Sequence, residues 1–437
     1  MKIYSIGGYN EVGKNMTAVE VGGEVVICDM GFFMEKIIPL QEESNIVPDD
    51  ILIKEGAVPD DSVLHNKNVV AIVASHAHLD HIGAIPVLAE RYKCPIIATP
   101  YTIEIIKHLV KDRKKRRLLG YLTPLNTGST LKITQNIKVE LVHITHSIPQ
   151  STLIALHTKE GIVTYLNDYK LDNTPTMGKK PDYERMKQLA KIGIKAHIEE
   201  CVRIEEHERT SSEYIAQIMV HDALNRAYES GKAVIITTFA SHIARIRNIV
   251  KANQNRRKII CIGRSMATYL KAAATLNLID LSDIAICPSK NQSGSVLEKV
   301  AKNPTGYLLI VTGNQGEPNS VLSSIAKNDL EYKLQKGDEI IFSSFTIPSP
   351  INKANKHTLE LLLKKRGARV INNVHVSGHA KREDHRDMIR LLKPKNIIPS
   401  HGNMEKLASF SSLAAEEGYV LGKTFHIMAN GGMVEIK

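Results

Sequence analysis

The sequence lacks tryptophan altogether, and all aromatic residues together make up only 5% of it. Binding of an unpaired nucleic acid through its bases depends on aromatic rings, so this composition predicts that stacking contributes little to any RNA or DNA affinity. Long apolar runs are missing too, because no stretch reaches the roughly 20 residues that a membrane-spanning helix needs. The N-terminus also lacks the pattern of a signal peptide. We therefore expect a cytoplasmic protein that is not bound to a membrane.

Cysteine is sparse and irregularly spaced. No CxxC pair occurs, and an odd number of scattered cysteines argues against both a disulfide framework and a zinc knuckle. We expect all of them to be buried free thiols in an intracellular protein. The five positions are Cys28, Cys94, Cys201, Cys261 and Cys287.

Basic residues outnumber acidic ones. The chain has 57 Lys and Arg against 46 Asp and Glu, which gives a net charge of +11. Such an excess indicates a polyanionic partner, and the phosphate backbone of a nucleic acid would supply one. The densest basic run is 111–117, which we expect on a helix that begins near Thr102. Two interpretations of this run stay open, namely a solvated helix face and a surface that contacts phosphate groups.

The chain of 437 residues is longer than one compact core usually spans, so two domains are expected. Its first third contains short β-branched runs bounded by glycine, which are typical of hairpin strands. Near Glu206 the pattern changes to alternating helices and strands, which indicates a parallel sheet. We expect an inserted domain over 206–365 that interrupts a first domain made of 1–205 and 366–437.

The most informative segment is Ser75–His81, in which three histidines and one aspartate fall within the six positions 76–81. It follows the apolar run 69–74, which predicts a buried strand, and it leads into an apolar segment that predicts a helix. Imidazole nitrogen and carboxylate oxygen are ligands of zinc and manganese. Their density at one strand-to-helix turn predicts a hydrolytic metal site that is able to hold two ions.

Residues of the same kind end several other predicted strands. Asp29, His146 and Asp168 each lie at or just after the end of an apolar run, and His379 and His401 do so near the C-terminus. Layered α/β proteins assemble their sites at the carboxyl ends of strands. We therefore expect these side chains to converge with those of Ser75–His81.

Taken together, these residues resemble the metallo-β-lactamase superfamily. Four features resemble its β-CASP branch of nucleases, namely the expected insert, Glu200, Ser377–His379 and Ser400–Gly402. The nearest likeness is to the ribonuclease J family in its archaeal form. The longer stretches with this likeness are 145–151, 312–318 and 375–380. The resemblance implies an α/β protein with a four-layer αββα metallo-β-lactamase domain and an inserted α/β domain that contains a parallel sheet.

The family pattern implies two zinc ions per subunit, with manganese or magnesium as alternative activators. It assigns His76, His78 and His146 to one ion and Asp80, His81 and His401 to the other. Asp168 would bind both ions. Asp80 counts among the catalytic residues as well. Asp29 is expected to accept a hydrogen bond from a ligating histidine or from bound water. His379 is expected to contact the scissile phosphate and to protonate or stabilise the leaving oxygen, and Glu200 to orient His379.

The resemblance further implies a single-stranded RNA substrate with a 5′-monophosphate. The segment His375-Val376-Ser377-Gly378-His379 would grip the terminal phosphate. Five residues would line the rest of the channel, namely Asn314, Gln315, Gly316, Ser343 and Ser344. We expect a zinc-dependent 5′-to-3′ exoribonuclease of RNA decay. In this scheme metal-activated hydroxide attacks the scissile phosphodiester, and nucleoside 5′-monophosphates are released.

Three alternatives stay open from the sequence. They are an endoribonuclease of the same fold, a small-molecule hydrolase of the lactonase or glyoxalase kind, and a non-catalytic RNA-binding subunit. Because the chain ends at Lys437, we expect it to lack the linker and C-terminal domain of bacterial family members. Homodimer formation and other RNA-decay partners are also left open.

Overall fold

The computed structural model describes residues 1–43 and 46–437, which divide into two compact units. Unit 1 contains residues 1–173, 178–210 and 378–437, and unit 2 contains residues 174–177 and 211–377. Strand β17 (Arg369–Ile371) pairs within the sheet of unit 2, although it lies beyond residue 365. The domain boundaries expected from the sequence stay a prediction.

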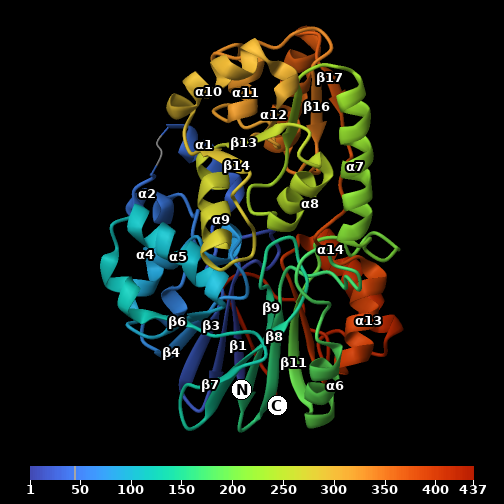
Figure 1. Ribbon diagram of the computed structural model, residues 1–437. Coiled ribbons are helices and arrows are strands. Elements are labelled where there is room, and N and C mark those ends of the chain that lie inside the picture. Colours follow the sequence, from blue (N-terminus) through green and yellow to red (C-terminus); the bar gives the residue numbers. More distant parts are fainter. Residues whose placement is uncertain (44–45) are drawn as a thin grey trace. The chain divides into compact units, whose positions relative to one another are not determined.

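Unit 1 contains two sheets (Figure 1). The first has the order β19-β1-β2-β3-β4-β5-β6 and the second the order β18-β11-β10-β9-β8-β7. The first sheet is made of β1 (Lys2–Gly7), β2 (Met16–Val21), β3 (Glu24–Cys28), β4 (Asn68–Val73), β5 (Ile96–Ala98), β6 (Leu122–Pro124) and β19 (Gly432–Glu435). The second is made of β7 (Thr130–Lys132), β8 (Ile137–His143), β9 (Thr152–Thr158), β10 (Gly161–Leu166), β11 (Ile194–Glu200) and β18 (Ile397–Ser400). Because β1 pairs with β19, the two ends of the chain lie side by side in one sheet.

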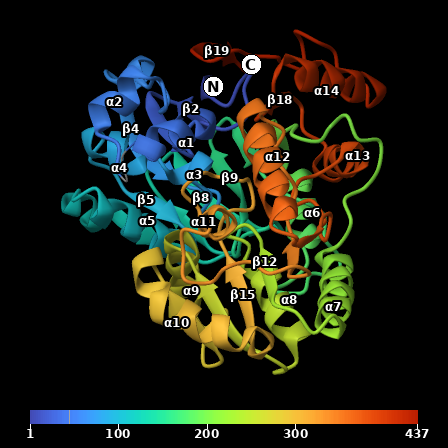
Figure 2. The ribbon, with the colours of Figure 1, turned by 90° about the horizontal axis from the view of Figure 1, so that it is seen from above.

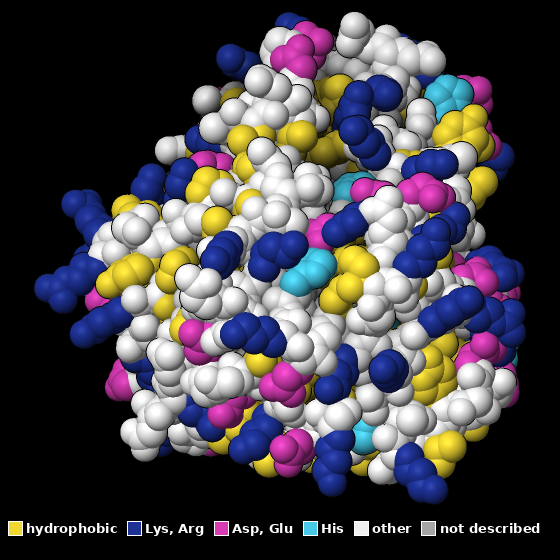
Figure 3. All heavy atoms as spheres, turned by 90° about the horizontal axis from the view of Figure 1, so that it is seen from below, with side chains coloured by type: hydrophobic (Ala, Val, Ile, Leu, Met, Phe, Trp, Pro, Cys, Tyr) yellow, Lys and Arg dark blue, Asp and Glu magenta, His cyan; other side chains and the backbone are white. Residues whose placement is uncertain are grey.

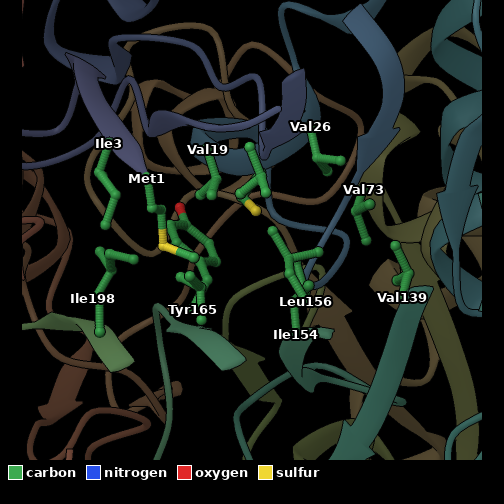
Figure 4. Close-up of a cluster of buried hydrophobic side chains, with 14 of the residues drawn as sticks. Met1, Ile3, Val19, Val26, Val73, Val139, Ile154, Leu156, Tyr165 and Ile198 are labelled. Carbon is green, nitrogen blue, oxygen red and sulfur yellow. The ribbon is translucent and has the colours of Figure 1, made fainter. Parts of the chain in front are cut away.

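The core of unit 1 lies between its two sheets. In Figure 4, side chains from the first sheet point toward side chains from the second, and all of those labelled are buried. Successive side chains of a strand point to opposite faces, so each sheet still has a second apolar face to cover. The labelled residues are Met1, Ile3, Val19, Val26 and Val73 on one side and Val139, Ile154, Leu156, Tyr165 and Ile198 on the other.

Helices cover the outer faces of these sheets. Helix α5 contacts strands β5 and β6 of the first sheet, and helix α4 contacts α5. Buried side chains of α6 and α13 pack against the second sheet. The helices of unit 1 are α1 (Met34–Glu43), α2 (Asp49–Lys54), α3 (Leu79–Ile82), α4 (Ile85–Leu88), α5 (Pro100–Asp112), α6 (Tyr183–Ile192), α13 (Arg382–Leu392) and α14 (Met404–Glu416). The resulting order of helices, sheet, sheet and helices confirms the expected αββα architecture.

The basic run 111–117 departs from the single helix expected for it. Helix α5 ends at Asp112, Lys114 has a left-handed backbone with φ of 59°, and a short 3-10 helix (Arg116–Tyr121) follows. A left-handed residue cannot continue a right-handed helix, so the prediction of one basic helix face is wrong. On the face of the protein seen in Figure 3, Lys and Arg side chains are spread among acidic and uncharged ones.

Unit 2 is built on one fully parallel sheet with the order β14-β13-β15-β12-β16-β17, as the sequence predicts. Its other strands are β12 (Val234–Thr237), β13 (Lys258–Ile262), β14 (Ile284–Cys287), β15 (Tyr307–Val311) and β16 (Glu339–Phe342). Helices flank this sheet (Figure 2): α7 (Glu213–Glu229), α8 (Ile243–Asn253), α9 (Arg264–Thr275), α10 (Lys290–Lys302), α11 (Val321–Lys327) and α12 (Pro350–Lys365). With right-handed crossovers, this strand order places α8 and α9 on one face and α10, α11 and α12 on the other.

Glu140 on β8 ties helix α6 to the second sheet of unit 1. Its carboxylate accepts hydrogen bonds from His157 Nε2 (2.6 Å) and from two nitrogens of Arg185 (2.6 and 3.0 Å). Burial alone would raise the pKa of Glu140, but the hydrogen bonds from His157 and Arg185 lower that pKa to about 2. The carboxylate is therefore ionised over the whole neutral and mildly acidic range.

We predict that Glu140→Gln lowers the free energy of unfolding by about 1–2 kcal/mol at neutral pH, a value reduced by solvent screening. Because the folded-state pKa lies below the ordinary value of about 4.3, the stabilisation is present above that value and is lost as the pH falls toward 2. The free energies of unfolding of the parent and of Glu140→Gln, measured with urea, should thus converge as the pH falls toward 2. Glu184→Gln, which changes an exposed residue of α6, should alter stability by less than about 0.5 kcal/mol. A difference between Glu140→Gln and the parent that is independent of pH would contradict this assignment.

Candidate metal centre

The histidine-rich segment lies where the sequence places it, at the carboxyl end of β4 and the start of α3. Asp29 directly follows β3, Asp168 follows β10 and His401 follows β18. His146 lies three residues beyond β8. All of these residues belong to unit 1, and seven of them form two adjoining groups of metal-binding atoms that share Asp168.

The first group consists of His76, His78, His146 and Asp168. Their ligand atoms all lie within 4.8 Å of one another. His78 Nδ1 is 3.0 Å from His76 Nε2 and 3.2 Å from His146 Nε2, and Asp168 Oδ2 lies 3.4–3.8 Å from these three nitrogens. Four donors around a tetrahedral zinc, with Zn–N bonds of about 2.0–2.1 Å, lie about 3.3–3.4 Å apart. The spacing therefore fits one zinc-sized ion.

The second group consists of Asp80, His81, Asp168 and His401. His81 Nε2 lies 3.6 Å from Asp80 Oδ2 and 3.4 Å from Asp168 Oδ2. His401 Nε2 lies 3.7 Å from Asp80 Oδ2 and 3.1 Å from Asp168 Oδ1. Asp168 thus presents one oxygen to both groups and its other oxygen to His401.

Two observations test whether a cation fits between these residues. The first is that His78 Nδ1 faces two other ring nitrogens, and a single proton on Nδ1 cannot serve both as a good hydrogen bond. The second is that buried Asp168 Oδ1 has no partner of hydrogen-bond geometry among the described residues. Bound cations would satisfy both features, so the donor set fits a pair of divalent ions.

Neighbouring groups hold the second nitrogen of each of four rings. His81 Nδ1 donates to Asp29 Oδ2 (2.7 Å), and His146 Nδ1 donates to the Gly378 carbonyl (2.7 Å). His76 Nδ1 lies 3.0 Å from Ser75 Oγ, and the Gly13 amide donates to His401 Nδ1 (3.0 Å). Such partners fix the orientation of ligating imidazoles. Asp29 lies where the sequence predicts it, behind a histidine of the second group.

The backbone at the centre is unusual. Asp29, Asp168 and His401 all have positive φ angles, of 60°, 60° and 54°. Aspartate and histidine tolerate this left-handed region better than most residues, yet it still costs energy, and such strain gathers at functional sites. Gly31 has a related role, because a Cβ there would lie 1.6 Å from the Asp80 carbonyl oxygen. Only glycine allows the β3 loop to approach the histidine-rich segment so closely.

Burial and charge set the protonation of the rings. Burial lowers the pKa of His76 to about 3 and that of His146 well below its ordinary value, so both rings are neutral and able to bind a metal at pH 7. Burial alone would also lower the pKa of His81, but the carboxylates of Asp168, Asp80 and Asp29 raise it well above the ordinary value. The two groups therefore differ in charge. The second group has two carboxylates, Asp80 and Asp168, whereas the first has only the shared Asp168.

His379 lies beside these two groups, and with Asp168 and Glu200 it forms a third set of atoms that could hold a metal ion. Its Nδ1 is 3.0 Å from Glu200 Oε2 and 3.7 Å from Asp168 Oδ1. Glu200 is fully buried at the end of β11, and its other oxygen accepts a hydrogen bond from the Tyr169 amide (2.9 Å). Burial alone would lower the pKa of His379, but Glu200 and Asp168 raise it to about 9. Glu200 is thus bonded to His379, and its expected role of orienting that ring in catalysis stays a prediction.

One expectation about His379 is wrong. The segment before it, residues 372–378, is not a strand, although the sequence Val374-His375-Val376 suggests one. Within this segment the Val374 carbonyl accepts from the Ser343 hydroxyl (2.8 Å), and after it the His379 carbonyl accepts from the Thr210 hydroxyl (2.6 Å). His379 is therefore positioned by a loop.

A buried network behind Glu200 was not predicted from the sequence. Glu199 accepts hydrogen bonds from the Tyr169 hydroxyl and from His385 Nδ1 (2.8 Å) on α13, and all three residues are fully buried. Because Glu199 and Glu200 are consecutive in β11, they point to opposite faces of the sheet. The paired acids at the end of a buried strand indicate that a buried polar network lies there, but they do not identify Tyr169 and His385 as its other members.

The remaining residues expected to bind substrate have different surroundings. In unit 2, Ser343 is fully buried, and its hydroxyl donates to the Val374 carbonyl (2.8 Å). This favours a structural role for Ser343 over the expected substrate contact. Val376 and Ser377 are buried and His375 is half-buried. In unit 1, Gly378 packs against His146 and Ser147, which lie 3.1–3.3 Å from where a Cβ would be.

Among residues 1–43 and 46–437, no helix has the length and the apolar composition that crossing a membrane requires.

Three family profiles match the chain. "Metallo-beta-lactamase superfamily" matches residues 9–171, and "Ribonuclease J, beta-CASP domain" matches residues 231–361. "Zn-dependent metallo-hydrolase RNA specificity domain" matches residues 365–427. The first and third matches include the residues of the metal-binding groups between them.

Several curated proteins are similar over the whole chain. A ribonuclease J from Pyrococcus abyssi is 44% identical, covering 100% of this chain and 97% of that protein. One from Methanocaldococcus jannaschii is 43% identical, covering 99% and 98%. A ribonuclease J from Helicobacter pylori is 30% identical, and the match covers 100% of this chain and 61% of that protein. A crystal structure of a protein of unknown function from Enterococcus faecalis V583 has a TM-score of 0.63 at 18% identity over 99% of both chains, which supports the fold alone.

We predict that His78→Ala lowers the divalent metal bound per chain from two ions toward one, because it removes the nitrogen that faces both His76 and His146. Mass-spectrometric metal analysis after dialysis measures this directly. His143→Ala is the matched control, since that ring lies at the end of β8 and contacts the Lys179 carbonyl. Equal metal content in His78→Ala and in the parent protein would rule out the first group as a metal site.

Proposed function

The chain belongs to the ribonuclease J family of metal-dependent ribonucleases, and we propose that within this family it is a zinc-dependent 5′-to-3′ exoribonuclease. Its substrate would be single-stranded RNA with a 5′-monophosphate, and its products nucleoside 5′-monophosphates. The observation that supports this best is the shared carboxylate of Asp168, which joins two zinc-sized donor groups beside His379. Five free cysteines support a reducing, cytoplasmic location.

The two groups would hold one ion each. His76, His78 and His146 would bind the first, Asp80, His81 and His401 the second, and Asp168 both. When bound, a pair of zinc ions supplies a water nucleophile at neutral pH and neutralises charge on the phosphate. Asp29 and Ser75 hold the rings of His81 and His76 in the orientation that ligation needs.

We assign to His379 the proton transfer to the leaving group. Hydrolysis of the phosphodiester breaks the bond between phosphorus and the 3′ oxygen, and that oxygen needs a proton as it leaves. Glu200 accepts from Nδ1 of His379, so Nε2 is the nitrogen that would transfer the proton. The remaining RNA keeps the phosphate on its new 5′ end. Each product is therefore a substrate for the next round, which supports processive removal from that end.

The segment His375-Val376-Ser377-Gly378 supports the choice of the 5′ end. Its small and polar residues suit a terminal phosphate, because hydroxyl and amide groups bind phosphate oxygens well. Gly378 has no side chain that would obstruct such a ligand. Its carbonyl accepts a hydrogen bond from His146 Nδ1. A grip on the terminal phosphate beside the ligand shell would present the first linkage for cleavage.

We predict that His379→Ala slows RNA cleavage by about 100-fold or more, the usual scale of acid–base assistance, while the bound metal stays near the parent level. Single-turnover cleavage and metal analysis of the same preparation test this together. His426→Ala is the control, because that half-buried ring of unit 1 lies 3.0 Å from Asn396 Oδ1 and outside the metal-binding groups. Loss of metal from His379→Ala would show that His379 is a ligand and that our division of roles is wrong.

We also predict a preference among 5′ ends. RNA with a 5′-monophosphate should be degraded faster than the same RNA with a triphosphate, and a circular RNA should resist cleavage. A time course on the three substrates, resolved to single nucleotides, measures rate and product size. Early mononucleotides support the proposal, whereas cutting of the circle identifies an endonuclease, and equal rates on both linear RNAs contradict the phosphate pocket.

A further inference from the structure

Unit 2 contains a cluster of three rings that are far apart in the sequence. Phe345 lies 5.7 Å from Phe239 and 5.2 Å from His375, and Phe239 lies 6.3 Å from His375, measured between ring centroids. All three side chains are only partly buried. The chain has seven phenylalanines and no tryptophan, so two phenylalanines in one half-exposed cluster are a notable concentration. We call Phe239, Phe345 and His375 the ring cluster.

The ring cluster lies at the carboxyl edge of the parallel sheet. Phe239 follows β12 by two residues, Phe345 follows β16 by three and His375 follows β17 by four. These strands are neighbours in the order β12-β16-β17. The crossovers that leave β12 and β16 run to opposite faces of the sheet, so the carboxyl edge between these two strands is a topological switch point. Ligands of open α/β sheets bind in this kind of place.

Two buried polar side chains at the same edge have unused hydrogen-bonding atoms. Asn314 lies just after β15, and Ser344 lies just after β16. Neither Asn314 Nδ2 nor Ser344 Oγ has a hydrogen-bond partner among the described residues. Asn314 is 6% exposed and Ser344 is 5% exposed. An amide donor and a hydroxyl left unpaired in this way are costly unless a ligand uses them. They are of the type that contacts the polar edge of a nucleobase.

The ring cluster is held rigidly from behind. Gln315 Nε2 donates to the Phe345 carbonyl (2.9 Å), and Gln315 Oε1 accepts from the Ile347 amide (2.8 Å). Arg245 is fully buried, and one of its terminal nitrogens lies 3.1 Å from His375 Nδ1. Glu213 accepts two hydrogen bonds from Arg245 (2.7 and 2.9 Å), which compensates the buried charge.

From these observations we propose that the ring cluster is a stacking platform for an unpaired base of the RNA substrate. The proposal rests on the proposed function and adds a base contact to it. Aromatic faces at a half-exposed edge bind bases of any sequence, and the nearby Asn314 and Ser344 would hydrogen-bond to the base edge. His375 precedes His379 by four residues, which span about 14 Å at most when fully extended. The stacked base therefore belongs to a nucleotide near the 5′ end.

The test combines changes in the protein with removal of single bases from the RNA. Each of the first six nucleotides of a 5′-monophosphorylated RNA is replaced in turn by an abasic one, which keeps the phosphate. With the parent enzyme, one or two of these replacements should raise KM by about fivefold or more, the loss expected for one stacked base. With Phe345→Leu and with Phe239→Leu, KM for the intact RNA should rise by a similar factor. The abasic replacements should then have no further effect.

The controls separate stacking from a structural role. Tyr214→Leu removes an exposed ring of α7, outside the ring cluster, and should leave the abasic profile unchanged. If Phe345→Leu and Phe239→Leu lower the melting temperature but keep the sensitivity to abasic sites, the rings are structural and the proposal is wrong. A flat abasic profile with an otherwise normal exoribonuclease overturns the platform alone. If no RNA is cut, the proposed function fails, and the same comparison made by fluorescence anisotropy on the intact strands still decides the platform.

Discussion

The buried carboxylate of Asp168 is the constraint on which the centre of unit 1 depends. It is 3% exposed and lies within 3.8 Å of nitrogens from six histidines. Burial alone would raise its pKa, but the rings of His379, His401 and His81 lower that pKa well below the ordinary value. An ionised carboxylate in this setting attracts cations strongly, and it can join two of them only if both donor groups face it.

The architecture of unit 1 follows from this constraint. Both sheets have to end at one edge, and the residues that follow their strands have to turn sharply toward one point. The left-handed backbones of Asp29, Asp168 and His401 and the close approach at Gly31 are the local consequences. Their cost is met by the large core between the sheets, and this is how folds retain strain at functional sites.

Much of this could be predicted from the sequence because the relevant signals are local. Apolar β-branched runs mark buried strands, and residue types at strand ends mark the ligands, so β4, β10 and β18 and the residues after them fell where expected. The end of α5 at Asp112 could not be predicted, because it depends on a left-handed Lys114 within an otherwise helix-compatible run. The loop before His379 was missed for a similar reason, since the Val374 carbonyl bonds to the distant Ser343 side chain although the local pattern suggests a strand.

Composition was a weaker guide than topology to the ring cluster of unit 2. Few aromatic residues argue against stacking when they are counted, yet parallel strands bring Phe239, Phe345 and His375 to one edge from positions more than a hundred residues apart at the extremes. The network of Glu199, Tyr169 and His385 behind Glu200 shows the same limitation. Convergence of distant residues depends on strand order, which a single sequence does not reveal.

The claim that Asp168 joins two ions is tested most directly by paramagnetic resonance of the protein loaded with manganese. A carboxylate shared between two ions holds them close enough for magnetic coupling, so our account predicts the spectrum of an exchange-coupled pair. Loss of that coupling in Asp168→Asn, with Asp172→Asn unchanged as control, would identify the bridge. Spectra of isolated, uncoupled manganese ions in the parent protein at full loading would contradict the account.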